Sequence, residues 1–142
     1  ELQKQSKVPI FSMPELAVKT CKKETNKSIR VGIMATNGTI SAGIYQKALI
    51  GKNVTPVIPD EYQQNLVMSL IYEDIKNRNF VDQEKYYQLI EYFFEECECD
   101  YIILGCTELS VAQEQTHYPS EYVIDAQFEL AKYVVNQVKQ AG

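Results

Sequence analysis

The chain has 142 residues, of which 45% are hydrophobic and 23% charged, and its formal net charge is −5. Such a composition is ordinary for a globular domain with its own core, and the negative charge argues against a nucleic-acid-binding protein. No apolar run approaches the ~20 residues of a membrane span, and the four cysteines do not form a dense secreted framework, so we expect a cytoplasmic protein with reduced thiols and no membrane partner.

The first half of the chain alternates short apolar runs with helical patterns. A proline inside the run over 8–11 indicates the edge or the end of a sheet, and Pro14 suits the first turn of a helix. The glycine at position 51 is a helix-stop signal. The predicted elements are a strand over 8–11, a helix from Pro14, a strand over 29–34, a loop over 35–39, a helix over about 41–50 and a strand over 54–58.

The second half continues the same alternation. Asp82 is placed to cap a helix whose apolar positions recur at helical spacing. The predicted elements are helices over about 60–77 and 83–97, a strand over 101–104, a helix over about 107–115, a strand over 122–125 and a helix over about 127–140. Strands separated by helices throughout predict the α/β class, with a parallel doubly wound sheet of about four strands flanked by helices.

Cys106 lies directly after the four apolar residues of the strand over 101–104, beyond a turn at Gly105. Open α/β sheets bind ligands at the carboxyl ends of their strands. The amides at the start of the following helix favour a thiolate, so we expect Cys106 to titrate below an ordinary thiol in the complete enzyme. The alternative from the residues alone is a small buried hydrophobic side chain, a common role of free cysteines.

Three segments carry a resemblance to a known family. The sequence GCTE at 105–108, after a buried apolar strand, resembles the second-cysteine motif of the aspartate/glutamate racemase family. The segment 29–40, followed by Ser41, Gly43 and Tyr45, is similar to the family's strand and Ala-Thr-x-Gly-Thr loop. The segment 57–59 leads, as in the family, into a long helix that carries a lysine. The three occur in the family's order and span most of the chain.

The resemblance implies an isomerase that inverts the α-carbon of an acidic amino acid without a cofactor. One cysteine, as thiolate, removes the α-proton, and the other, as thiol, reprotonates the opposite face. By resemblance Cys106 is one of the two, and Thr36, Thr39 and Thr107 are donors around the substrate. The alternative role for the threonines is loop and helix-cap structure.

Two further residues are assigned to the substrate by resemblance. Lys76 is expected to bind a substrate carboxylate, because aspartate-type members carry a lysine on the corresponding helix. Its alternative is a solvated lysine near a helix end. Glu108 follows Gly-Cys-Thr where glutamate racemases of the family usually carry histidine, which favours an aspartate-type substrate without excluding glutamate.

The resemblance also predicts how the chain is divided. Residues 1–27 correspond to the end of a first domain and a linker helix, 28–125 to a second α/β domain, and 126–142 to a helix that returns to the first domain. The family's first cysteine motif, Cys-Asn-Thr, is absent from this sequence. We therefore expect half of an enzyme of two similar domains, which lacks its N-terminal domain, is inactive alone, and forms a homodimer that buries the apolar surfaces of 8–11 and 130–138.

Other functions stay open at this point. One is another cofactor-free isomerase of the same superfamily, of the hydantoin racemase or maleate isomerase type, and another is a carboxylate-binding domain without catalysis. Cys97, Cys99 and His117 do not have the spacing of a zinc site, so no metal is expected. No dinucleotide or P-loop glycine motif is present.

Overall fold

The computed structural model describes residues 28–49 and 54–126. Four strands form one sheet in the order β2-β1-β3-β4, and every neighbouring pair is parallel. The strands are β1 (Ile29–Met34), β2 (Val54–Val57), β3 (Tyr101–Leu104) and β4 (Val123–Asp125). The predicted α/β class with a parallel sheet is confirmed. The strand expected over 8–11, the helices expected from Pro14 and over 127–140, and the dimer surface based on them fall outside the described residues.

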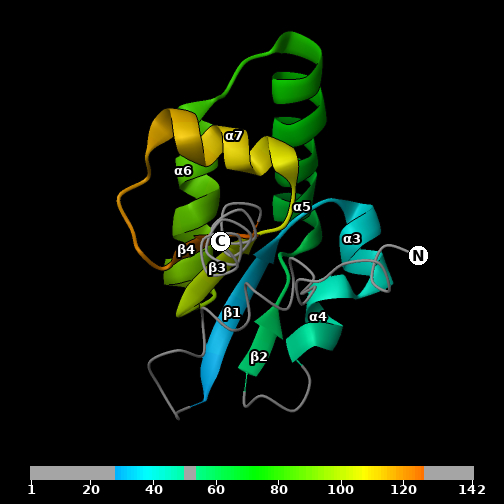
Figure 1. Ribbon diagram of the computed structural model, residues 1–142, viewed down its shortest axis with the longest axis vertical. Helices are drawn as coiled ribbons and strands as arrows, with labels where there is room; N and C mark the ends of the chain where they lie inside the picture. Colours follow the sequence, from blue (N-terminus) through cyan, green and yellow to red (C-terminus); the bar gives the residue numbers. More distant parts are fainter. Residues whose placement is uncertain (1–27, 50–53, 127–142) are drawn as a thin grey trace, which may run out of the picture.

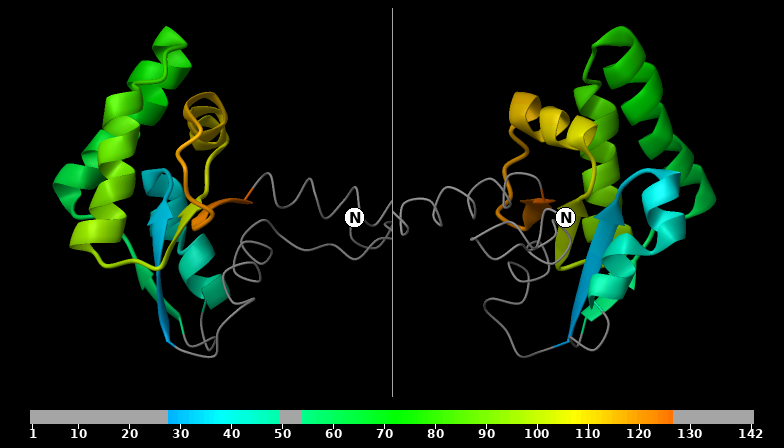
Figure 2. Two further views of the ribbon diagram at one scale, coloured as in Figure 1. Left: turned by 90° about the vertical axis from the view of Figure 1, so that its left-hand side faces the viewer. Right: turned by 45° about the vertical axis from the view of Figure 1, so that its right-hand side comes forward.

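Alternate side chains of β3 enter two separate cores. Ile102 and Leu104 pack with helices on one face of the sheet, and Ile103 packs on the other face. Burial on both faces explains why the strand is a continuous apolar run rather than an alternating one. Figure 2 shows helices on both sides of the sheet, as a doubly wound fold requires.

The helix after β1 starts earlier than the sequence predicted. Residues 37–39, expected in a loop, form the first turn of α3 (Asn37–Ala42), because the Thr36 side chain accepts a hydrogen bond from the Thr39 amide and caps the helix. Gly43 then adopts a left-handed conformation with φ 69° and separates α3 from α4 (Ile44–Leu49). The single helix predicted over 41–50 is therefore wrong in its start and in its continuity.

A pair of long helical segments covers one face of the sheet. The first consists of α5 (Glu61–Met68) and its π-helical continuation η2 (Ser69–Asn77), and the second of α6 (Gln83–Glu91) and η3 (Tyr92–Glu96). Asp82 caps α6 as predicted. Lys85 bonds the buried Asp74 carboxylate at 2.8 Å and so joins the two segments by a largely buried ion pair. None of the helices in the described ranges is long and apolar enough to cross a membrane.

The carboxyl ends of the strands all point toward one edge of the sheet. In Figure 1 the helices that begin after β2 extend past this edge, and α7 (Thr107–Thr116) lies across it. The start of α3 lies at the end of β1 on the same edge. The arrangement gathers the turns after β1 and β3, which carry most of the predicted site residues, at one end of the domain.

Candidate functional site

The turns after β1 and β3 lie side by side. Met34 pairs with Leu104 in the sheet, and the amide of Gly105 donates to the carbonyl of Met34 at 2.9 Å, so the ladder continues past the strand ends. Thr36 and Cys106 each lie two residues beyond this last pair. Two of the predicted site residues, 70 positions apart in the chain, thus follow the ends of neighbouring paired strands.

The two threonines of the first turn bond one another. The Thr36 hydroxyl donates to Thr39 Oγ1 at 3.1 Å and accepts the hydrogen bond from the Thr39 amide at 3.3 Å. Both side chains are half-buried. The structural role weighed for them from sequence, a helix cap, is therefore real for Thr36. Capping uses only an acceptor site of the oxygen, and the bond between the two hydroxyls uses one of their two hydrogens, so one hydrogen of the pair remains for a ligand.

Cys106 is the N-cap residue of α7, but its side chain makes no capping hydrogen bond. The thiol instead donates to Glu108 Oε1 at 3.0 Å. Burial, followed by this hydrogen bond, raises the pKa of Cys106 to about 11, although the backbone amides of Glu108 and Leu109 act in the opposite direction. In this domain desolvation and a neighbouring carboxylate outweigh the helix amides. The lowered pKa expected for the complete enzyme stays a prediction.

The Cys106 turn rests on a buried aromatic ring. A side chain at Gly105 would place its Cβ 2.6 Å from Cε2 of Tyr45, a distance that real contacts do not permit. Tyr45 is only 2% exposed, and burial raises its pKa to about 12, with Cys106 and Asp125 as further causes. The ring therefore remains neutral and fixes the backbone that precedes the thiol. Sequence analysis named Tyr45 as a motif residue but gave it no role.

The start of α7 is also tied to β4. Ser110 donates to Asp125 Oδ1 at 2.7 Å, and its amide bonds the carbonyl of Cys106 at 3.2 Å. Thr107, the first residue of α7, is exposed at the carboxyl edge. Cys106, Thr107 and Glu108 follow β3, and Thr36 and Thr39 follow the neighbouring strand β1, so all five lie beyond the carboxyl ends of adjacent strands. Their joint role in one site stays a prediction.

Lys76 is not drawn into this cluster. It is exposed near the end of η2, and its ammonium lies 5.0 Å from the centre of the Tyr72 ring on the same helix. The described contact of Lys76 is therefore with Tyr72 of its own helix.

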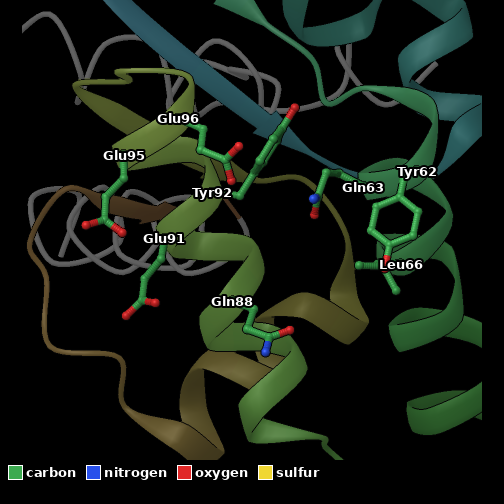
Figure 3. A pocket seen from close by; sticks show the side chains of 8 residues that line it. All are labelled: Tyr62, Gln63, Leu66, Gln88, Glu91, Tyr92, Glu95 and Glu96. Atoms are coloured by element: carbon green, nitrogen blue, oxygen red, sulfur yellow. The ribbon is translucent and has the colours of Figure 1, made fainter.

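A separate pocket of about 300 Å³ lies between α5 and the helix formed by α6 and η3 (Figure 3). Glu91, Glu95 and Glu96 line one side of it, and Tyr62 and Leu66 the other. None of the predicted site residues lines it. Three carboxylates repel an acidic ligand, so the pocket is not a suitable place for an acidic amino acid.

The remaining described cysteines lie at the opposite end of β3. Cys97 and Cys99 precede this strand, whereas Cys106 follows it. Four strand residues at ~3.3 Å each separate the two ends by more than 10 Å. Burial raises the pKa of Cys99 to about 12, which keeps it a thiol. Within the described part of the chain, no three His, Cys, Asp or Glu side chains gather where they could hold a metal ion.

One polar residue near the site was missed from sequence. Gln64 of α5 donates from Nε2 to the carbonyl of Ala35 and to Oδ1 of Asn37, at 2.9 Å each. The missed signal was its spacing, because Gln64 is three and seven positions before the buried Val67 and Ile71. A glutamine on the buried stripe of an amphipathic helix must have polar partners in the fold.

The fold and the turns define an α/β domain with a cysteine and threonines at the carboxyl edge of a parallel sheet. The sequence over residues 1–133 matches the family described as Asp/Glu/Hydantoin racemase, and the chain belongs to that family. Among curated relatives, it is 31% identical over 136 residues to an uncharacterised protein of Pectobacterium carotovorum and 29% identical over 139 residues to the broad specificity amino-acid racemase RacX of Bacillus subtilis.

Solved structures agree with this assignment. The domain superposes on an aspartate racemase homologue from Pyrococcus horikoshii with a TM-score of 0.75 and 27% identity, over 96% of this chain and 60% of that one. It superposes on the Picrophilus torridus aspartate racemase with a TM-score of 0.63 and 28% identity, over 92% of this chain and 53% of that one. The match to the Pectobacterium protein covers 95% of this chain and 89% of that protein. The match to RacX covers 96% of this chain but only 57% of RacX.

Proposed function

We propose that the protein takes part in racemisation of an acidic amino acid, with Cys106 as one of two cysteines that exchange the α-proton. The observation that carries the proposal is that Thr36 and Cys106 each lie two residues beyond the last paired residues of neighbouring strands, at the carboxyl edge of the sheet. Hydroxyl donors next to a thiol are what an enzyme needs to stabilise charge on a substrate carboxylate while a proton leaves Cα.

The protonation state of Cys106 gives it a direction in this reaction. With a pKa of about 11 it is a thiol at neutral pH, which is the form that donates a proton to the planar intermediate. The proton passes from sulfur to Cα on one face, after a thiolate has removed the original α-proton from the other face. Glu108 holds the thiol hydrogen at 3.0 Å and so keeps Cys106 in its donating form.

The second thiol has to come from outside residues 28–49 and 54–126. Cys97 and Cys99 lie at the far end of the sheet, where they cannot face a substrate bound at Cys106. The matched region covers 57% of RacX, 53% of the Picrophilus aspartate racemase and 60% of the Pyrococcus homologue. We propose that 28–125 is one of two similar domains, that 1–27 and 126–142 belong with the other, and that the chain alone does not racemise.

For the substrate we propose aspartate ahead of glutamate. The support is Glu108 in the motif and the aspartate racemases among the structural relatives. Lys76, Thr107 and the two threonines of the first turn are the proposed carboxylate ligands, and no cofactor takes part. We further propose that the 142-residue chain is a homodimer, which light scattering after size-exclusion chromatography would show at micromolar concentration, with a stable monomer as the contrary result.

Exchange in deuterated water tests the proposal. The purified chain is incubated with L- and D-aspartate, and deuterium at Cα and the enantiomer ratio are followed by NMR and chiral chromatography. One thiol on one face can exchange the α-proton without inversion. We expect slow exchange, lost in Cys106→Ser, and no inversion. A protein extended by the region that the longer relatives have in addition is expected to invert aspartate. Exchange that survives Cys106→Ser, or an extended protein that inverts nothing, would refute the assignment.

A second function, binding of a carboxylate without catalysis, is favoured by one observation. The raised pKa of Cys106 leaves only a small fraction of the thiolate that proton abstraction requires. The same experiment separates the two, because a binding domain takes up aspartate and leaves its α-hydrogen unexchanged at every pH. A hydantoin or maleate substrate is distinguished by offering those compounds in the same assay.

A further inference from the structure

We propose that Gln64 is a positioning residue for the candidate site and that its side-chain amide holds Thr36 in place beside Cys106. The inference rests on the proposed function for the meaning of Thr36 as a substrate donor. The geometry of the hydrogen bonds is independent of that function.

The two hydrogen bonds of Gln64 fall on either side of Thr36. Nε2 donates one hydrogen to the carbonyl of Ala35, which is the peptide before Thr36, and the other to Oδ1 of Asn37, the residue after it, both at 2.9 Å. The amide of Asn37 is additionally bonded to Sδ of Met68 at 3.4 Å. Helix α5 thus forms hydrogen bonds with the turn after β1 at the residues on both sides of Thr36.

The first turn of α5, which carries Gln64, is itself held by hydrogen bonds. The Asp60 side chain caps α5 through the Gln63 amide at 2.8 Å, and the Gln64 amide bonds the carbonyl of Asp60 at 2.8 Å. Gln64 therefore lies in the first turn of a well-capped helix, where its backbone has little freedom. Gln64 and Met68 of α5 both bond the turn, and Gln64 supplies the two hydrogen bonds that flank Thr36.

The chemistry of the site requires an amide. Two acceptor oxygens face Nε2, and a neutral side chain of this length with two donor hydrogens is glutamine. A glutamate would place its own carboxylate oxygens against these two acceptor oxygens, and a methionine would offer no donor. Reversing the amide is excluded for the same reason, so the orientation of Gln64 is defined by its partners.

The side-chain carbonyl oxygen of Gln64 indicates that the residue is explained by its two donor hydrogens. Oε1 of Gln64 is buried and has no hydrogen-bond partner within the described residues. A buried carbonyl oxygen without a partner costs free energy. Packing alone would be served by an apolar side chain that lacks this cost. The glutamine is explained by the position of the turn that its two hydrogens hold.

The consequence for Thr36 concerns both its backbone and its hydroxyl. The Thr36 carbonyl accepts the amide of Ile40 at 3.0 Å, and its hydroxyl accepts the amide of Thr39. If Gln64 releases the turn, these two bonds loosen, and the hydroxyl no longer faces a substrate from a fixed point. A donor displaced by about 1 Å loses much of its effect in a site that works by preorganisation.

The test compares Gln64→Met with Gln63→Met in the 142-residue chain. Methionine keeps the length of the side chain and removes both donors. Gln63 is its neighbour on α5, and its side chain lines the separate acidic pocket (Figure 3), so it is a matched control. Three quantities are measured: amide hydrogen exchange at Thr39 and Ile40, the dissociation constant of aspartate by NMR titration, and the melting temperature.

We expect Gln64→Met to speed exchange at Thr39 and Ile40 by about 10-fold or more and to weaken aspartate binding by a similar factor. The melting temperature and the alkylation rate of Cys106 should change little, which a general loss of structure would not allow. Gln63→Met should leave all of these unchanged. Unaltered exchange and affinity in Gln64→Met would overturn the proposal.

A second variant covers the case in which Gln64→Met does not fold. Asn37 is exposed, and Asn37→Ala removes one of the two acceptors. It should shift exchange at Thr39 and Ile40 in the same direction by a smaller factor, and no shift would contradict the proposal. If the parent chain binds no aspartate, the failure concerns substrate binding by this chain alone, while the amide exchange measurement still decides whether Gln64 holds the turn.

Discussion

The two turns at the carboxyl edge of the sheet solve the same structural problem in different ways. After β1, the cap residue Thr36 bonds the Thr39 amide through its own side chain. After β3, the cap residue Cys106 makes no such bond, and its thiol turns to Glu108. The first turn uses its polar groups to hold itself together. The second leaves helix amides facing a sulfur atom.

The difference follows from the atoms involved. A hydroxyl oxygen is a good acceptor for a helix amide, whereas a thiol sulfur is a weak one. The amides of Glu108 and Leu109 therefore gain most when Cys106 becomes a thiolate, and they lower its pKa, but burial and the carboxylate of Glu108 act more strongly the other way. A turn of this kind is poorly optimised for stability and well suited to a proton that is held and released.

The largest effect we expect is on the reactivity of Cys106. With a pKa of about 11, its thiolate fraction at pH 8 is on the order of 100-fold below that of a peptide thiol, whose pKa is about 8.5. Alkylation by iodoacetamide, followed at Cys106 by mass spectrometry of the peptides, should be slower by that factor and should rise as the pH approaches 11.

Glu108→Gln is the matched change for this measurement. Glutamine removes the negative charge beside the thiol and leaves a weaker, neutral acceptor, so the pKa of Cys106 should fall and the alkylation rate at pH 8 should rise by about 10-fold. Glu114→Gln, an exposed change farther along α7, should have no effect. A Cys106 that reacts as fast as a peptide thiol at pH 8 would show that the second turn favours the thiolate after all.

The next effect separates the turns by their glycines. Gly105→Ala drives a Cβ to 2.6 Å from the buried Tyr45 ring, and overpacking of this kind costs about 1–3 kcal/mol. Gly38→Ala in the first turn meets nothing nearer than 4.0 Å and lies in α3, where alanine is favoured over glycine by up to about 1 kcal/mol. In urea unfolding, Gly105→Ala should lower the unfolding free energy and Gly38→Ala should raise it. Equal destabilisation would mean that Tyr45 does not support the Cys106 turn.

A smaller effect tests the caps directly. Thr36→Ala removes a capping side chain and should cost about 1 kcal/mol of unfolding free energy. Cys106→Ser supplies a stronger acceptor at a cap that lacks one, so stability should be unchanged or higher by up to about 1 kcal/mol. Denaturant titration of both variants measures the contrast. A clear loss of stability in Cys106→Ser would indicate that the sulfur is needed for packing.

The smallest effect on stability is expected at Lys76. It is exposed, and its described contact is with the Tyr72 ring, so Lys76→Ala should change the unfolding free energy by less than about 1 kcal/mol. If Lys76 binds the substrate carboxylate, Lys76→Ala should weaken the binding free energy of aspartate by more than about 1 kcal/mol, because charge-assisted hydrogen bonds are the stronger ones. Lys47→Ala, an exposed lysine in the last turn of α4, is the control. Parallel losses in melting temperature and binding would argue against a ligand role.

Local residue patterns in the sequence determined most of the helices and strands and the position of the Cys106 thiol. The strand over 101–104, the helix from 107 and the cap at Asp82 all appear where residue patterns predicted them. Apolar runs, capping side chains and glycines act over a few residues, so their effects can be read without knowing the fold. For the same reason the sequence could assign Cys106 to the carboxyl end of a strand.

The tertiary structure alone decided the state of that thiol and the partners of the opposite turn. The pKa of Cys106 depends on its partial burial against the core and on its hydrogen bond to Glu108, neither of which a motif contains. The bond from Gln64 to Ala35 joins residues 29 positions apart. Desolvation and long-range hydrogen bonds exist only once distant segments have packed, and for that reason they had to be read from the fold.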